Sequence, residues 1–213
     1  MHKFVSILLK VVLIGAIVLL LYKDEVHRQP MVDFENTIDQ FVDAGFHPNI
    51  SRLEEELLNH RKIVITTGIN AFSSKRIIEG LLLLNARDKN ASIDLFIRTE
   101  GGWEADAFSI IDTIGSIQAP VNVHAIGDVH SSGLIILAAG TGERFVYENT
   151  VIGFHSTEAD DEEPWKSRYK SFLDGHSKLP PEWLSREDGS FEYFTAVEAI
   201  EYKVADRLIT SKR

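Results

Sequence analysis

Two adjacent serines and one histidine are the residues of this chain best suited to chemistry. Residues 127–140 read GDVHSSGLIILAAG, so Ser131 and Ser132 stand at the start of an apolar run with the length of a short buried helix. Serine is common at a helix N-terminus because its hydroxyl can accept a hydrogen bond from a free backbone N–H. The alternative is that one hydroxyl is a nucleophile, which requires a base within reach.

His155 is the histidine best placed to be that base, because it ends an apolar segment expected in the same sheet as the segment before Ser131. His130 adjoins the serine, but successive side chains of an extended segment point in opposite directions. His124 alternates with apolar residues inside a predicted strand, which favours a packed side chain. The pair Ser131 and His155 is therefore a candidate nucleophile and general base for acyl transfer.

Acyl transfer also needs N–H donors for a negatively charged oxygen, and two turns could supply them. Residues 100–103 (EGGW) place paired glycines just before a helix, so free backbone N–H groups there could face an anion. Ser132 N–H lies at the start of another helix and is the second candidate. A glycine pair alone is weak evidence, since tight turns often require glycine.

The segments that would position these groups alternate between strands and helices. Apolar strands are predicted at residues 62–69, 92–98, 121–127, 143–147 and 151–155. Helices are predicted at residues 33–45, 51–60, 73–86, 104–117, 131–139, 165–173 and 195–202. This alternation predicts an α/β fold with a mostly parallel sheet covered by helices on both faces. Both glycine-rich turns then fall at the carboxyl ends of strands, where such sheets hold their active crevice.

Residues 4–22 (FVSILLKVVLIGAIVLLLY) form an apolar stretch whose only charge is Lys10. As a helix this stretch would be about 28 Å long, close to the roughly 30 Å of a bilayer's hydrocarbon core. A cleaved signal peptide is the alternative, but residues 20–27 (LLYKDEVH) lack the small residues of a cleavage site. Basic residues before the apolar centre predict a cytoplasmic N-terminus. We therefore expect an anchor and linker in residues 1–30 and one α/β domain in residues 31–213.

Composition excludes several classes of function. The net charge of −10, from 32 acidic and 22 basic side chains, would repel a phosphate backbone, so no nucleic-acid partner is expected. The absence of cysteine excludes disulfides, thiolate nucleophiles and cysteine metal sites. No cluster of histidine and carboxylate residues has metal-ligand spacing, so neither a metal nor another cofactor is predicted.

Residues 93–155 resemble the core of the ClpP proteolytic subunit, within the ClpP/crotonase superfamily. The family motifs SPGG, GxAxSMGxxLLAAG and PN[ST]xxxxH correspond here to TEGG at 99–102, GDVHSSGLIILAAG at 127–140 and ENTVIGFH at 148–155. The resemblance implies that Ser131 is the nucleophile, that His155 is the general base, and that the N–H groups of Gly102 and Ser132 form the oxyanion hole. It further implies a serine peptidase with a peptide or protein substrate and a homo-oligomeric state.

Two departures from this family pattern affect the expected function. Phe191 occupies the position of the family's catalytic aspartate, so either Asp188 or Glu192 takes that role, or the triad lacks an acid. The apolar N-terminus is foreign to the ClpP subunit and is similar to extracytoplasmic, membrane-tethered members of the superfamily. The resemblance thus predicts a single-pass inner-membrane protein with a periplasmic domain.

Three alternatives remain open from the sequence. A scaffold without catalytic activity would keep the fold to bind peptides or a membrane partner, as Phe191 suggests. An enzyme related to the crotonases would use the same N–H groups on an acyl-CoA thioester, although the acidic residues around both turns disfavour CoA. Finally, a serine–lysine dyad would replace His155 by one of the available lysines, Lys166, Lys170 or Lys203.

Overall fold

The computed structural model describes residues 52–156, 164–186 and 188–211. The predicted apolar anchor and the predicted helix at residues 33–45 lie outside these residues, as does the proposed domain boundary. Among the helices that are described, none is both long and apolar enough to cross a membrane. The elements that follow belong to the compact unit that begins at residue 54, apart from residues 52 and 53.

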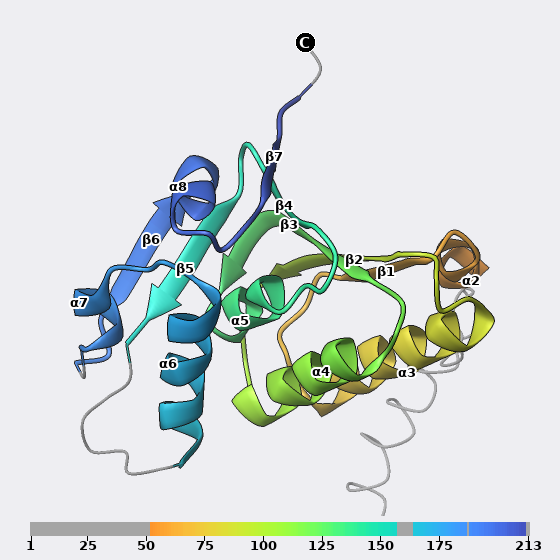
Figure 1. Cartoon of the computed structure of the whole chain (residues 1–213), viewed down its shortest axis with the longest axis horizontal. Coiled ribbons are helices and arrows are strands. Elements are labelled where there is room, and N and C mark those ends of the chain that lie inside the picture. Colours follow the sequence, from red (N-terminus) through yellow and green to blue (C-terminus); the bar gives the residue numbers. More distant parts are fainter. Residues whose placement is uncertain (1–51, 157–163, 187, 212–213) are drawn as a thin grey trace, which may run out of the picture. The chain divides into compact units, whose positions relative to one another are not determined.

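One sheet organises the described residues, and its strands pair in parallel with a single exception (Figure 1). The strands are β1 (Lys62–Ile65), β2 (Ile93–Thr99), β3 (Val121–His130), β4 (Arg144–Tyr147), β5 (Val151–His155), β6 (Phe191–Thr195) and β7 (Arg207–Ile209). Their order is β1-β2-β3-β4-β7, and β5 pairs with β3 and with β6. Only the β5–β6 pair is antiparallel. The predicted α/β fold with a mostly parallel sheet is confirmed.

Helices follow the strands in the predicted alternation. They are α2 (Arg52–Asn59), α3 (Ala71–Arg87), α4 (Glu104–Ser116), α5 (Ser132–Ala138), α6 (Pro164–His176), α7 (Pro181–Leu184) and α8 (Ala196–Glu201). Helix α3 begins two residues earlier than predicted because Asn70 Oδ1 accepts hydrogen bonds from the N–H groups of Phe72 and Ser73. Helices α3 and α4 lie side by side in Figure 1.

Burial alternates along β2 and β3, so one face of these strands forms the core and the other is partly exposed. The fully buried residues of the core include Ile77, Leu81, Ile93, Leu95, Ile97, Ile110, Ile114, Val121, Val123 and Leu134. On the second face, the polar residues Asp94, Asn122 and His124 interrupt the apolar pattern and are half-buried, so burial of this face is incomplete.

His124 is a packed side chain, as predicted. Its ring lies between Phe96 and Phe145 at centroid distances of 4.3 and 4.4 Å, and Nε2 lies 3.3 Å from Asp94 Oδ1. Burial lowers the pKa of His124, although the hydrogen bond with Asp94 opposes that shift. The distance along β3 from His124 to Ser131 keeps this histidine out of the candidate site.

Three further predictions of the sequence need correction. Strand β3 continues to His130, through residues expected to form a turn, because Gly127 adopts a φ of 63° and the register with β2 shifts there. Strand β6 and helix α7 occupy the segment between the predicted helices at residues 165–173 and 195–202, for which no element was predicted. Strand β7 was also not predicted, since three residues carry too little pattern to be recognised.

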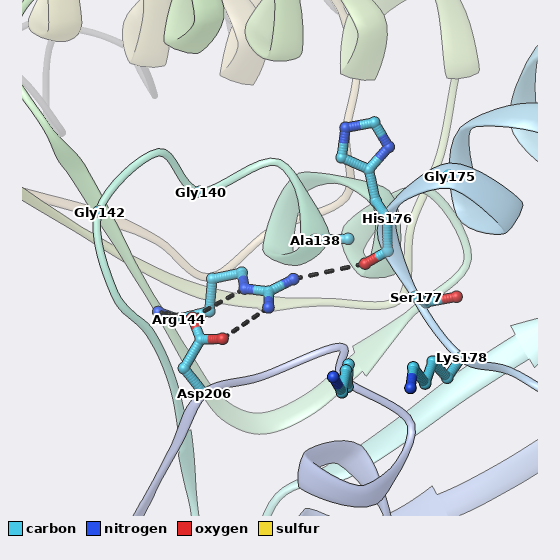
Figure 2. Close-up of a pocket in the computed structure, with 10 residues that line it drawn as sticks. Ala138, Gly140, Gly142, Arg144, Gly175, His176, Ser177, Lys178 and Asp206 are labelled. Carbon is cyan, nitrogen blue, oxygen red and sulfur yellow. Dashed lines mark hydrogen bonds and ion pairs between the residues drawn. The ribbon is translucent and has the colours of Figure 1, made fainter.

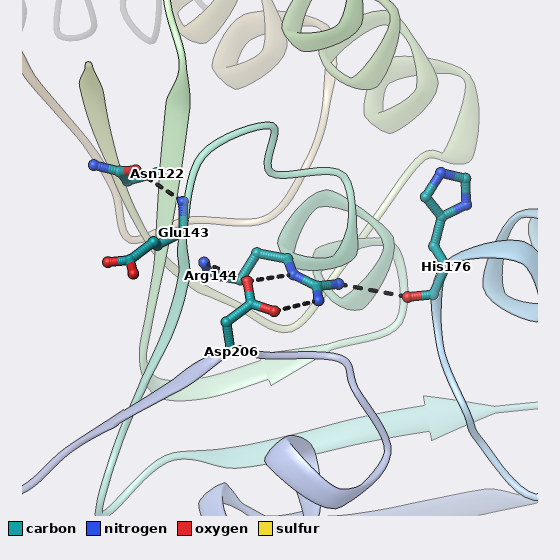
Figure 3. A network of polar contacts seen from close by, with 5 residues as sticks. All are labelled: Asn122, Glu143, Arg144, His176 and Asp206. Atoms are coloured by element: carbon teal, nitrogen blue, oxygen red, sulfur yellow. Dashed lines mark hydrogen bonds and ion pairs between the residues drawn. The ribbon is translucent and has the colours of Figure 1, made fainter. Parts of the chain in front are cut away.

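An open cavity of about 550 Å³ lies between the loop after α5 and the C-terminal end of α6 (Figure 2). Its lining residues are Ala138, Gly140, Gly142, Arg144, Gly175, His176, Ser177, Lys178, Lys203 and Asp206. The Arg144 guanidinium lies across the cavity in two hydrogen bonds to the Asp206 carboxylate, of 2.6 and 2.9 Å (Figure 3). Asp206 also accepts a hydrogen bond from Arg144 N–H, so the pair joins β4 to the start of β7.

We predict that Asp206→Asn lowers the free energy of unfolding by about 1 kcal/mol at neutral pH, since the ion pair is bidentate but partly exposed. Hydrogen bonds from Arg144 lower the pKa of Asp206 below 3.8, so the stabilisation is complete above that pH. It is lost as the pH falls through the lowered value, where the mutant and the parent converge.

Urea unfolding across a pH series measures this difference. Glu143→Gln is the matched control, because Glu143 pairs with Arg207 in a more exposed ion pair. Equal losses for the two variants, or a difference between Asp206→Asn and the parent that grows in acid, would contradict the assignment.

Candidate active site

Ser131 and His155, predicted from the sequence as a pair, are hydrogen-bonded. The distance from Ser131 Oγ to His155 Nε2 is 2.7 Å. Ser131 directly follows β3 and His155 ends β5, and these two strands pair in parallel through residues 128–130 and 151–153. Ser131 N–H donates to Gly153 O at 2.9 Å, which continues the pairing by one residue. The strand register therefore brings the two side chains together.

The backbone of Ser131 has the conformation of a sharp, strained turn. Its φ of 53° and ψ of −123° are unfavourable for a residue with a Cβ atom, and such outliers persist only where the surrounding structure enforces them. The Ser131 hydroxyl makes no capping hydrogen bond to α5, although Ser131 is the N-cap residue. The hydroxyl thus bonds to the imidazole, and the capping interpretation of Ser131 is wrong.

The second ring nitrogen of His155 fixes its tautomer. Nδ1 lies 3.0 Å from the backbone carbonyl oxygen of Ser156. Because a carbonyl oxygen only accepts hydrogen bonds, Nδ1 carries the proton and Nε2 presents a lone pair to the Ser131 hydroxyl. The ring packs against Phe191 at 5.1 Å and Tyr169 at 6.0 Å. This is the tautomer and orientation that a general base needs.

The residue paired with His155 across the sheet is not an acid. Phe191 is directly opposite His155 in the β5–β6 pairing. Asp188 instead accepts hydrogen bonds from Ser156 Oγ at 2.9 Å and from Ser190 N–H at 3.0 Å. Glu192 forms an ion pair with Arg186. Among the described residues, neither candidate carboxylate nor any other is hydrogen-bonded to His155.

The pKa of the Asp188 carboxyl is low. Hydrogen bonds from Ser190, and then from Ser156, hold this pKa at about 2, below its ordinary value of 3.8. Asp188 is therefore ionised throughout the pH range in which a histidine can act as a base. The negative charge of Asp188 is hydrogen-bonded to the hydroxyl of Ser156. The backbone carbonyl oxygen of the same serine accepts the hydrogen bond from His155 Nδ1.

The glycine turn after β2 packs directly against Ser131. A Cβ atom on Gly101 would lie 2.6 Å from Ser131 Cβ, so only glycine permits this approach. Ile69 N–H donates to Gly101 O, and Trp103 N–H donates to Ile69 O. These bonds leave the Gly102 N–H outside the pairing with Ile69. In the described part of the chain, the Gly102 N–H has no hydrogen-bond acceptor.

Ser132 supplies the second predicted N–H donor. Ser132 is the first residue of α5, where a backbone N–H has no acceptor within the helix. Strands β2 and β3 are parallel neighbours, so the turn at Gly102 and the start of α5 lie at adjacent strand ends. The predicted donors thus come from the two segments that enclose Ser131.

Lysine is not the partner of Ser131 in the described structure. Lys170 and Lys203 make no hydrogen bond to the Ser131 hydroxyl, and Lys203 lines the cavity at Arg144. The side chain of Lys166 lies outside what is described. None of the lining residues of that cavity belongs to the Ser131–His155 site.

Sequence reasoning missed two residues of the site. Ser156 contributes a backbone carbonyl, which no pattern of residue types can reveal. Tyr169 is 1% exposed and stacks on His155 from α6, and its pKa is raised by burial and by the nearby charge of Glu104. Only its place on the apolar face of a predicted helix could have indicated that it is buried.

The family model that describes Clp protease matches residues 48–212. The ATP-dependent Clp protease proteolytic subunit 3 of Streptomyces coelicolor is 30% identical over 174 residues, which cover 75% of this chain and 80% of the relative. The chain belongs to the Clp protease family. Proteolytic subunit 1 from Streptomyces avermitilis is 30% identical over 79% of this chain and 91% of its own length. The chloroplastic proteolytic subunit 4 of Arabidopsis thaliana is 32% identical over 72% of this chain and 57% of its own length.

Membership of this family confirms the resemblance inferred from the sequence motifs. The chain is a ClpP-like serine-type peptidase. The match includes all three motifs and the segment with Asp188 and Phe191.

The turn that packs against Ser131 predicts the effect of a substitution at Gly102. This glycine has a φ of 148°, and a Cβ atom there would lie 2.0 Å from Ile69 O. We expect Gly102→Ala to lower the free energy of unfolding by about 1–3 kcal/mol. In the matched control Gly115→Ala, a Cβ atom meets nothing within 4 Å, and the helical position should gain about 0.5–1 kcal/mol. Urea unfolding that finds Gly102→Ala as stable as Gly115→Ala would contradict the close approach.

Proposed function

We propose that this chain is a membrane-anchored serine peptidase that cleaves peptide bonds through an acyl-enzyme on Ser131. The observation that carries the proposal is the 2.7 Å contact between Ser131 Oγ and His155 Nε2, with the Nδ1 proton directed at Ser156 O. A hydroxyl bonded to a neutral imidazole in the accepting tautomer is the starting arrangement for nucleophilic attack on a carbonyl.

The reaction follows from this arrangement. Ser131 Oγ attacks the scissile carbonyl carbon while its proton passes to His155 Nε2. The carbonyl oxygen becomes negative, and we assign its stabilisation to the N–H groups of Gly102 and Ser132. Collapse of the intermediate breaks the C–N bond, and His155 returns the proton to the departing amine. Water then attacks the acyl-enzyme by the same route and restores Ser131.

A reactive phosphonate tests this assignment without knowledge of the substrate. A fluorophosphonate probe should label the full chain on Ser131, as located by peptide mass spectrometry, and Ser131→Ala should abolish labelling. His155→Ala should slow it by about 10²- to 10⁴-fold, the usual contribution of a general base. Ser109→Ala, on the exposed side of α4, is the matched control and should label like the parent.

The second candidate function is a scaffold that binds peptides or a membrane partner without hydrolysing them. Phe191 favours it, because a phenylalanine opposite His155 removes the charge that usually stabilises the imidazolium. A correctly folded parent chain that no fluorophosphonate labels would support the scaffold and refute the peptidase assignment.

The proposed location rests on residues 4–22, whose length and apolarity suit a bilayer-spanning helix. The basic residues before the apolar centre support a periplasmic peptidase domain on an inner-membrane anchor. We also infer a peptide or protein substrate and a homo-oligomer, on the grounds that the relatives are named as proteolytic subunits.

We predict that the full chain stays in the membrane pellet after extraction with alkaline carbonate, whereas a chain without residues 1–30 is recovered in solution. Protease added to spheroplasts should digest the domain of the full chain, since the positive-inside rule places it outside the inner membrane. Release of the full chain by carbonate would refute the anchor. Protection of its domain until the spheroplasts are lysed would refute the orientation alone.

A further inference from the structure

Ser156, whose carbonyl oxygen accepts the hydrogen bond from His155 Nδ1, is fixed by hydrogen bonds of its own. Ser156 is 3% exposed, and its N–H donates to Ser190 O at 2.9 Å. Its hydroxyl donates to Asp188 Oδ1 at 2.9 Å. Two independent hydrogen bonds therefore connect Ser156 to the loop before β6, and they fix the carbonyl oxygen that lies 3.0 Å from His155 Nδ1.

Asp188 anchors this arrangement. Its Oδ1 atom accepts both the Ser156 hydroxyl and the Ser190 N–H, so one carboxylate orients two residues of the loop. In the described part of the chain, Asp188 has no cationic partner, and its charge is not neutralised. The path from the carboxylate to the imidazole runs through a single residue.

We propose that Ser156 and Asp188 are positioning residues that together replace the missing triad acid. This inference rests on the proposed peptidase function. Asp188 holds Ser156 so that its carbonyl oxygen keeps the proton on Nδ1 and the lone pair on Nε2. The carboxylate also places a negative charge two hydrogen bonds away from the imidazolium that forms when Ser131 gives up its proton, and this charge favours the charged form.

The other groups around His155 do not perform this role. Phe191 and Tyr169 contact the ring but carry no charge, and the charge of Glu104 raises the pKa of Tyr169. The ion pair between Arg186 and Glu192 offsets its own charges. In the described loop, Asp188 is thus the charged residue that is hydrogen-bonded to Ser156, which in turn orients His155.

Asp188→Asn separates the charge from the hydrogen bonds. An asparagine Oδ1 can still accept from Ser156 and Ser190, so the variant removes the charge and keeps the shape of the loop. We expect the second-order rate of fluorophosphonate labelling to fall roughly 5- to 50-fold. That is well below the loss of about 10⁴ seen when a directly bonded triad acid is replaced.

The pH profile distinguishes an electrostatic role from a purely structural one. Loss of a negative charge disfavours the imidazolium, so the ascending limb of the pH–rate profile should move to lower pH in Asp188→Asn. The rate difference between parent and variant should narrow in about 1 M salt, because exposed charges are screened over a few ångströms there. A loop that was merely displaced would change neither.

Two further variants complete the test. Ser156→Ala removes the hydrogen bond to the carboxylate but not the negative charge, so it should slow labelling with a smaller change in the pH profile than Asp188→Asn. If Asp188→Asn folds poorly, Ser156→Ala still tests the connection, and a folded Ser156→Ala variant that labels at the parent rate would overturn the positioning role. Glu182→Gln, which removes an exposed negative charge on α7, is the matched control and should leave the rate and the pH profile unchanged.

The two proposals fail in different ways. A parent chain that reacts on Ser131, together with folded variants whose rates and pH profiles match it within twofold, would overturn the positioning role and leave the peptidase assignment intact. A folded parent chain that does not react on Ser131 would overturn the peptidase assignment, and the positioning role with it.

Discussion

The parallel pairing of β3 with β5 is the constraint on which the site depends. Ser131 and His155 are far apart in the chain, and their side chains meet because Asp128, Val129 and His130 lie in register with residues 151–153. A shift of one residue would turn alternate side chains to the opposite face of the sheet. The buried Ile152 and Phe154 on β5 oppose such a shift, because it would expose them to water. Core packing therefore also sets the distance between hydroxyl and imidazole.

The environment of His155 divides the usual work of a triad acid between two groups. The Ser156 carbonyl selects the tautomer but carries only a dipole, so it stabilises the imidazolium less than a carboxylate in direct contact would. The negative charge resides on Asp188, one hydroxyl group further away. The rate enhancement consequently depends more heavily on the N–H groups that face the developing oxyanion, which do not require a charged acid.

Most of the fold and the reacting pair could be predicted from the sequence, because strong signals carry them. The alternation of apolar strands and helices gave the parallel sheet, and three motifs gave Ser131, His155, Gly102 and Ser132. The replacement for the acid could not be predicted, because a backbone carbonyl leaves no trace in residue type. Strand β6 was also missed: its FEYFT segment follows a polar turn and is held by pairing with β5 rather than by a pattern of its own.

The most direct test of the account is a crystal structure of the full chain with a peptide boronic acid, which mimics the tetrahedral intermediate. The account predicts a covalent bond from boron to Ser131 Oγ, with one boronate oxygen within hydrogen-bond distance of both Gly102 N and Ser132 N. A boronate oxygen directed away from these two N–H groups, or a peptide bound in the site without a bond to Ser131, would contradict it.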